Sequence, residues 1–141
     1  MPELWKFKLD IRRKGLSLGW TDTDFDDGKW ELISTYNFYE RQGYKNYDGA
    51  FCYRTTIKGP KLANKERCYL RIGALDDEGS VFVNGVKVLT RWHLNPNDWM
   101  SSFEIDITDV IKSEETISIA VYGNDEYGVG GIWKPCALYV K

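Results

Sequence analysis

One irregular stretch of the sequence holds the residue types that recognise sugars. It runs from Trp92 to Trp99, and polar or charged side chains accompany its two tryptophans: Arg91, His93, Asn95 and Asp98. The apolar C–H face of a pyranose stacks on Trp or Tyr, while amides, carboxylates and guanidinium groups hold its hydroxyls. We therefore expect a saccharide site here. The alternative is a loop that two buried rings hold against its own domain, since large rings are usually buried.

Two further clusters share this mixture of aromatic and polar residues. Asn124, Glu126 and Tyr127 stand together, and Trp133 follows a pair of glycines that would let the backbone approach another surface closely. We add these four residues to the candidate ligand-binding set. The third cluster contains Tyr39, Glu40, Tyr44 and Tyr47.

The sequence offers no catalytic constellation. A glycosidase needs two carboxyl groups about 5 to 9 Å apart across a cleft. Asp76, Asp77 and Glu78 are adjacent, and a solvated turn is the commoner use of such aspartates. His93 is the single histidine, and no G-x-S-x-G elbow accompanies it. We therefore expect a protein that is not an enzyme and has no catalytic residues.

Aspartates near the start of the chain raise the question of a structural calcium, which takes six to eight oxygen ligands. They are Asp22, Asp24, Asp26 and Asp27, and Asp125-Glu126 add two more carboxylates. The favoured interpretation is that Asp26 and Asp27 form a turn before Trp30, because turns are the more frequent role of Asp. We expect no metal ligands and no cofactor, with calcium as the less favoured alternative.

The elements that must position these residues are strands. Apolar residues alternate with polar ones in 51–58, 68–72, 81–89, 103–107, 117–121 and 138–140. Asn84-Gly85 predicts a two-residue hairpin turn. Only Thr108 to Lys112 could form a short helical turn, capped by Thr108 or Asp106. Strands about ten residues apart with turn signals between them predict an all-β sandwich or barrel.

Composition and charge further limit the kinds of protein that this chain can be. The 141 residues are enough for one domain, and we assign 1–141 to a single unit. The net charge of −2 is spread along the chain, which disfavours a nucleic-acid surface. No apolar run approaches the roughly 20 residues of a membrane span. Cys52, Cys68 and Cys136 fall in strand patterns and are expected to be buried hydrophobes, so they leave the compartment open.

Several motifs in sequence order resemble the N-terminal sugar-binding domain of glycoside hydrolase family 2. They are Gly19-Trp20, Phe25-Asp26-Asp27-Gly28-Lys29-Trp30, Tyr39-Glu40-Arg41-Gln42-Gly43, Tyr47 to Arg54, Leu75-Asp76-Asp77, Val81 to Gly85, Phe103 to Thr108 and Gly130 to Pro135. Tyr39 and Cys52 stand where the family usually has Trp. The resemblance implies a galactose-binding-like jelly roll of two antiparallel sheets. It also implies that Tyr47-Asp48-Gly49 can lie near the active site of an adjoining catalytic barrel.

The resemblance and the loop residues together predict a non-catalytic carbohydrate-binding module. Trp5, Trp20 and Trp30 are assigned to structure, and the loop aromatics to a carbohydrate ligand. The alternative is a structural accessory domain that packs on a glycoside hydrolase catalytic domain and binds no sugar alone. This alternative predicts that Trp133 and the Tyr39–Tyr47 stretch form an exposed apolar patch for a protein partner.

Overall fold

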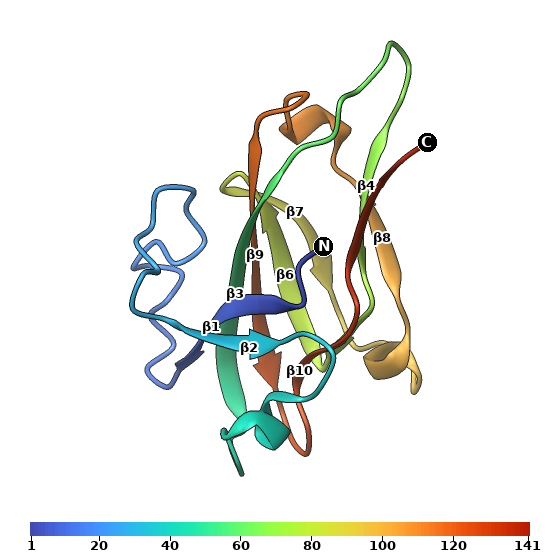
Figure 1. Ribbon diagram of the computed structural model, residues 1–141. Helices are drawn as coiled ribbons and strands as arrows, with labels where there is room; N and C mark the ends of the chain where they lie inside the picture. The colour runs from blue at the N-terminus through green and yellow to red at the C-terminus, as the bar shows by residue number, and fades with distance from the viewer.

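The computed structural model describes residues 1–141, and its regular secondary structure consists of antiparallel strands and three short helical turns (Figure 1). One sheet has six strands in the order β2-β1-β3-β9-β6-β7. Its strands are β1 (Leu4–Asp10), β2 (Glu31–Ser34), β3 (Gly49–Lys58), β6 (Glu78–Val83), β7 (Val86–Arg91) and β9 (Thr116–Asp125). The all-β class predicted from the alternating pattern is therefore confirmed.

The opposing layer is a three-stranded sheet of order β11-β4-β8 together with a two-stranded ribbon. The bounds are β4 (Cys68–Ile72), β8 (Phe103–Asp106) and β11 (Ala137–Val140) for the sheet, and β5 (Ala74–Asp76) and β10 (Gly131–Lys134) for the ribbon. Gly73 connects β4 to β5. The backbone near Pro135 passes so close to Gly73 that a Cβ there would lie 2.3 Å from the Pro135 carbonyl oxygen. The two layers enclose the core as a sandwich, and the jelly-roll description remains a prediction.

Period-two alternation places the core as the sequence predicts. Ile117, Ile119 and Val121 of β9 are fully buried and share one apolar cluster with Leu70 and Ile72 of β4. All three cysteines are buried and free, in agreement with their assignment as small hydrophobes. No helix is long and apolar enough to span a membrane.

The Asn84-Gly85 turn joins β6 to β7 as predicted, with both residues at positive φ (49° and 79°). The Asn84 side chain donates to the Val110 carbonyl and accepts from the Ser118 N–H, each at 2.9 Å. This turn is thereby tied to the short helix η3 (Thr108–Val110), where Asp106 Oδ1 accepts from the Thr108 N–H at 3.1 Å. The N-cap position of η3 is Ile107, which makes no side-chain cap hydrogen bond, so neither Thr108 nor Asp106 is the cap that the sequence predicts.

A covering loop, residues 11–30, folds over the outer face of the six-stranded sheet (Figure 1). Trp20 and Trp30 are buried there against Cys52, in a second and smaller apolar cluster. Arg54 points to the same side and is 3% exposed. Its Nε lies 2.8 Å from Asp27 Oδ2. The structural assignment of Trp5, Trp20 and Trp30 is confirmed, because all three are at least nine-tenths buried.

Replacing Asp27 with alanine should destabilise the fold, because Arg54 would keep a buried charge without a counter-ion. Breaking such a pair costs about 3 kcal/mol, near the low end of the usual range because Asp27 is partly exposed. The matched control is Asp109→Ala, since Asp109 is 88% exposed and 3.7 Å from Arg67. That variant should lose less than about 0.5 kcal/mol. Urea unfolding would measure both, and equal losses would contradict the anchoring role of Arg54.

Candidate functional site

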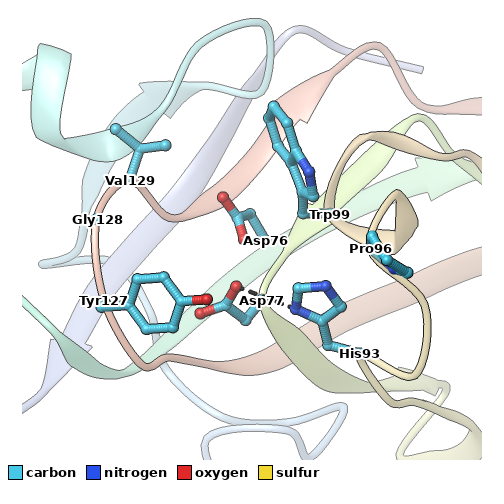
Figure 2. Close-up of a pocket in the computed structure, with 8 residues that line it drawn as sticks. All are labelled: Asp76, Asp77, His93, Pro96, Trp99, Tyr127, Gly128 and Val129. Carbon is cyan, nitrogen blue, oxygen red and sulfur yellow. Dashed lines mark ion pairs between the residues drawn. The ribbon is translucent and has the colours of Figure 1, made fainter.

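A pocket of about 450 Å³ opens at the end of the sandwich where β5, the short helix η2 (Asp98–Met100) and the β9–β10 loop meet (Figure 2). Eight residues line it: Asp76, Asp77, His93, Pro96, Trp99, Tyr127, Gly128 and Val129. Three of these belong to the predicted ligand-binding set, namely His93, Trp99 and Tyr127. The structure thus brings part of the two predicted loop clusters into one cavity.

The two aspartates in the pocket correct a sequence-based expectation. Asp76 is the last residue of β5 and Asp77 lies between β5 and β6, and they are 5% and 7% exposed. The prediction that they form a solvated turn is therefore wrong. Strand pairing with β10 draws this segment into the interior, and the Glu126 N–H donates to Asp77 Oδ2 at 2.9 Å.

Asp125 completes a carboxylate cluster with Asp76 and Asp77. It is the last residue of β9 and is 1% exposed, and the Tyr39 hydroxyl donates to its Oδ2 at 2.9 Å. Burial, reinforced by the neighbouring carboxyl groups, raises the pKa of Asp76 to about 9. Burial likewise raises the pKa of Asp125 to about 7, although its hydrogen bond from Tyr39 acts against the shift.

Asp77 carries the ionised charge of this cluster. Burial acts to raise its pKa as well, but hydrogen bonds from Asp76 and from the Glu126 N–H outweigh burial, so the pKa of Asp77 is lowered. His93 lies beside it, with Nδ1 3.4 Å from Asp77 Oδ1 (Figure 2). Neighbouring carboxyl groups whose pKa values are shifted in opposite directions are typical of functional sites.

Some carboxylate oxygens in and beside the carboxylate cluster receive no hydrogen bond from the chain. No Lys or Arg pairs with any of its three members. Asp125 Oδ1 is buried without a hydrogen-bond partner, and so is Oε1 of the neighbouring Glu40. An unpaired buried acceptor costs about 1–3 kcal/mol, which a ligand or partner that brings donors would recover.

A ring stack of Phe38, Trp133 and Trp99 lies beside the pocket. The Phe38 and Trp133 centroids are 4.7 Å apart, and those of Trp99 and Trp133 are 5.4 Å apart. The Trp133 indole N–H donates to the Trp99 carbonyl at 2.9 Å. Trp133 thereby joins β10 to η2, and it remains partly exposed, with Lys134 Nζ 4.5 Å from its ring centroid.

Other predicted residues are engaged in holding the 92–99 loop. Asp98 accepts hydrogen bonds from the backbone N–H groups of Leu94 and Asn95 at 2.9 and 2.8 Å. Arg91 Nη2 lies 2.9 Å from Asp98 Oδ1, and its guanidinium stands over the Phe103 ring. These contacts give Arg91, Asn95 and Asp98 an internal role, and whether they also touch a ligand stays a prediction.

The remaining predicted residues lie outside this pocket. Trp92 and Asn124 line a separate depression on the outer face of the six-stranded sheet. Glu126 is exposed and contributes its backbone N–H to Asp77. Of the ten predicted residues, three therefore line the pocket, two line the depression and five line neither.

The Tyr39–Tyr47 stretch does not form the predicted exposed patch. Tyr39 begins the short helix η1 (Tyr39–Gln42) and is fully buried. Tyr44 and Tyr47 pack against the main core. That part of the prediction is wrong, because the rings fill the space beside Phe7 and Phe51.

Of the early aspartates, the Asp26 side chain forms a turn, as the favoured interpretation predicts, whereas that of Asp27 forms an ion pair. Asp26 Oδ1 accepts from the Gly28 N–H at 2.9 Å, and Asp27 pairs with Arg54. Nowhere in the chain do three or more His, Cys, Asp or Glu side chains form a group that could hold a metal ion.

Comparison with solved structures places this fold in known enzymes. The Lactobacillus rhamnosus β-glucuronidase matches with a TM-score of 0.76 and 26% identity over 89% of this chain. A Ruminococcus gnavus β-glucuronidase matches with a TM-score of 0.76 and 21% identity over 89% of this chain. The chain spans only 20% of either enzyme. No family model matches the sequence.

These matches confirm the predicted resemblance to the N-terminal domain of family 2 glycoside hydrolases. They also agree with the expectation of a chain that is not itself an enzyme. A chain that covers a fifth of such an enzyme and folds as a β-sandwich is not its catalytic barrel.

The raised pKa of Asp125 makes stability depend on pH. Between the ordinary Asp value near 4 and about 7, the folded state keeps a proton that the unfolded state has released, so stability falls as pH rises. Asp125→Asn keeps the acceptor for Tyr39 and removes the ionisation, so its urea midpoint should fall less from pH 5 to pH 8. Asp24→Asn, in an exposed turn, is the control and should follow the wild type. An unchanged slope in Asp125→Asn would contradict this assignment.

Proposed function

We propose that this chain is a non-catalytic accessory domain of a glycoside hydrolase and packs against a catalytic barrel. The proposal rests on how much of each chain the structural match covers. The match spans 89% of this chain but 20% of the L. rhamnosus β-glucuronidase, as expected for one module of a larger enzyme. The substrate of that larger enzyme would be a glycoside, and a glucuronide is the first to test.

The end of the sandwich that carries the pocket is the face we propose for docking. Tyr127 is 71% exposed there, and Met100 at the end of η2 is 40% exposed. Trp133 of the ring stack is partly exposed, and Lys134 beside it donates to the Met100 carbonyl at 2.6 Å. Aromatic residues and Met are enriched at the centres of protein interfaces. Gly49, the start of β3, pairs with Asp125 at this same end. It belongs to the stretch that the family resemblance places near a neighbouring active site.

The charges at the pocket end of the sandwich also support docking there. Asp125 Oδ1 and Glu40 Oε1 are buried acceptors without donors, and His93 is the one basic side chain that pairs with the cluster. A barrel that brings Lys, Arg or backbone N–H groups would convert an unfavourable burial into charge-assisted hydrogen bonds. Such a contact would strengthen docking and fix its orientation.

A second candidate function is glycan binding by the isolated chain in this pocket. Trp99, Tyr127 and His93 line it beside two aspartates, and sugar hydroxyls could supply the missing donors. A few stacked rings at about 1 kcal/mol each would give dissociation constants in the micromolar to millimolar range. The coverage of the matches favours the accessory domain over this reading.

The accessory role can be tested in a chimaera in which this chain replaces the matching fifth of the L. rhamnosus β-glucuronidase. We expect one cooperative unfolding transition and hydrolysis of p-nitrophenyl glucuronide well above that of the truncated enzyme. Tyr127→Ala in the chimaera should lower both the transition temperature and the activity, because it removes an exposed ring from the docking face. Leu18→Ala is the matched control, since Leu18 is 60% exposed on the covering loop.

Two results would contradict the proposal. One is a chimaera whose parts unfold independently and whose activity equals that of the truncated enzyme. The other is saturable glycan binding by the isolated chain that Tyr127→Ala abolishes, which would favour the second candidate function.

A further inference from the structure

The outer face of the six-stranded sheet carries two rows of polar side chains that the covering loop leaves open. Strand register places Thr90, Ser80 and Tyr122 in one row across β7, β6 and β9. The next row contains Glu78 and Asn124. The covering loop approaches the opposite end of the β6–β7 hairpin, where Thr23 lies beside Gly85. The rows are therefore open to solvent at one end of the hairpin.

These rows line a depression of about 130 Å³ on the outer face. Trp92, the residue after β7, stands at its rim and is 56% exposed. Tyr122 forms the opposite side, and its hydroxyl donates to Asp10. An exposed indole beside a polar sheet surface is suited to stack on the apolar face of a pyranose.

The polar groups in the depression are largely uncommitted. Ser80 Oγ and Thr90 Oγ1 lie 3.1 Å apart and bond only to each other, which leaves one hydroxyl hydrogen free. The Glu78 carboxylate makes no hydrogen bond or ion pair within the chain, and Asn124 Oδ1 is buried without a donor. Hydroxyl, amide and carboxylate groups at this spacing suit the alternating donors and acceptors of sugar hydroxyls.

The floor of the depression is held rigidly by the core beneath it. A Cβ at Gly123 would lie 2.3 Å from Phe51 Cζ, and one at Gly79 would lie 2.8 Å from the Tyr122 carbonyl oxygen. The strands are therefore pressed against their neighbours at this point, and the rows above them are fixed before any ligand arrives. Such preorganisation lowers the entropy lost on binding.

We propose that this depression is a binding site for a neutral pyranose unit of an oligosaccharide, with Trp92 as its stacking platform. Glu78 is the one charged side chain in the lining, and the Asp10 carboxylate lies behind Tyr122. No Lys or Arg lines the depression, so a uronic acid would meet negative charge without a counter-ion. The site differs in place and charge preference from the docking end, and it does not depend on the proposed accessory role.

The test is an NMR titration of the ¹⁵N-labelled chain with neutral β-1,4-linked tetrasaccharides of glucose, xylose, mannose and galactose. We expect at least one of them to shift the amides of Ser80 and Thr90 and the indole N–H of Trp92, saturating at millimolar concentration. Tetragalacturonic acid, the anionic probe, should bind about tenfold more weakly than the best neutral probe.

Three variants test whether the tetrasaccharide binds at Trp92. Trp92→Ala should weaken binding about tenfold or more, and Trp92→Tyr should retain most of it, since both rings stack on a pyranose. Tyr127→Ala removes an exposed ring at the other site and should change nothing. Because Trp92 is half exposed, thermal unfolding should be similar in all three variants.

The absence of saturable shifts at these groups with every neutral probe up to about 20 mM would overturn the proposal. Shifts centred on Tyr127 and Gly128, or equal binding of tetragalacturonic acid, would also overturn it. The chimaera experiment tests a different face, so either proposal can fail while the other stands.

Discussion

The pairing of β9 with β3 is the constraint on which the rest of the molecule depends. The two strands run antiparallel over ten residue pairs, from Gly49 opposite Asp125 to Lys58 opposite Thr116. Alternation along β9 sends Ile117, Ile119 and Val121 into the core and ends with Asn124 and Asp125 on opposite faces. Asp125 thereby enters the carboxylate cluster, and Asn124 enters the outer-face depression. One register fixes both sites, and a shift by one residue would exchange them.

The outer face of the six-stranded sheet is also buried near β1 and β3, whereas antiparallel sheets commonly leave one face open to solvent. The covering loop achieves this burial with two tryptophans and with the contact between Asp27 and Arg54. Arg54 lies at a strand position that an apolar residue would ordinarily fill. Its guanidinium stands over Phe25 and donates to the Trp20 carbonyl, so one side chain orients most of the loop. The loop leaves β6 and β7 uncovered, and the polar rows lie on that uncovered part.

Much of the fold follows from local sequence, whereas the site does so only in part. Alternation in 68–72 and 117–121 predicts core strands, and Asn84-Gly85 predicts a hairpin, because these signals act between near neighbours. Asp76 and Asp77 were misread because local preference assigns paired aspartates to turns. Their burial arises from pairing with β10, more than fifty residues away. The exposed patch that the accessory-domain alternative predicts around Tyr39 fails for a similar reason, since the partners of Tyr39, Asp125 and Phe51, are remote in sequence. A signal was available for Asp125: it continues the alternation of Ile117, Ile119 and Val121, so period two places its carboxylate on the core side of the strand, where a charge is costly.

The carboxylate cluster is difficult to explain by stability alone. Replacing buried ionisable groups by apolar residues of similar size is often neutral or stabilising, so their retention favours a role in binding. One oxygen of the cluster, Asp125 Oδ1, is buried without a donor, and the cluster lies at the end of the sandwich. The outer-face depression has free donors and acceptors and lies on the side of the sandwich. A domain that docks through its end keeps its side open to solvent. In such an assembly the acceptors of the cluster would be satisfied by the barrel, while Trp92 would remain free to hold a neutral sugar beside it. The two sites therefore fit one molecule, in which docking and sugar capture use different faces.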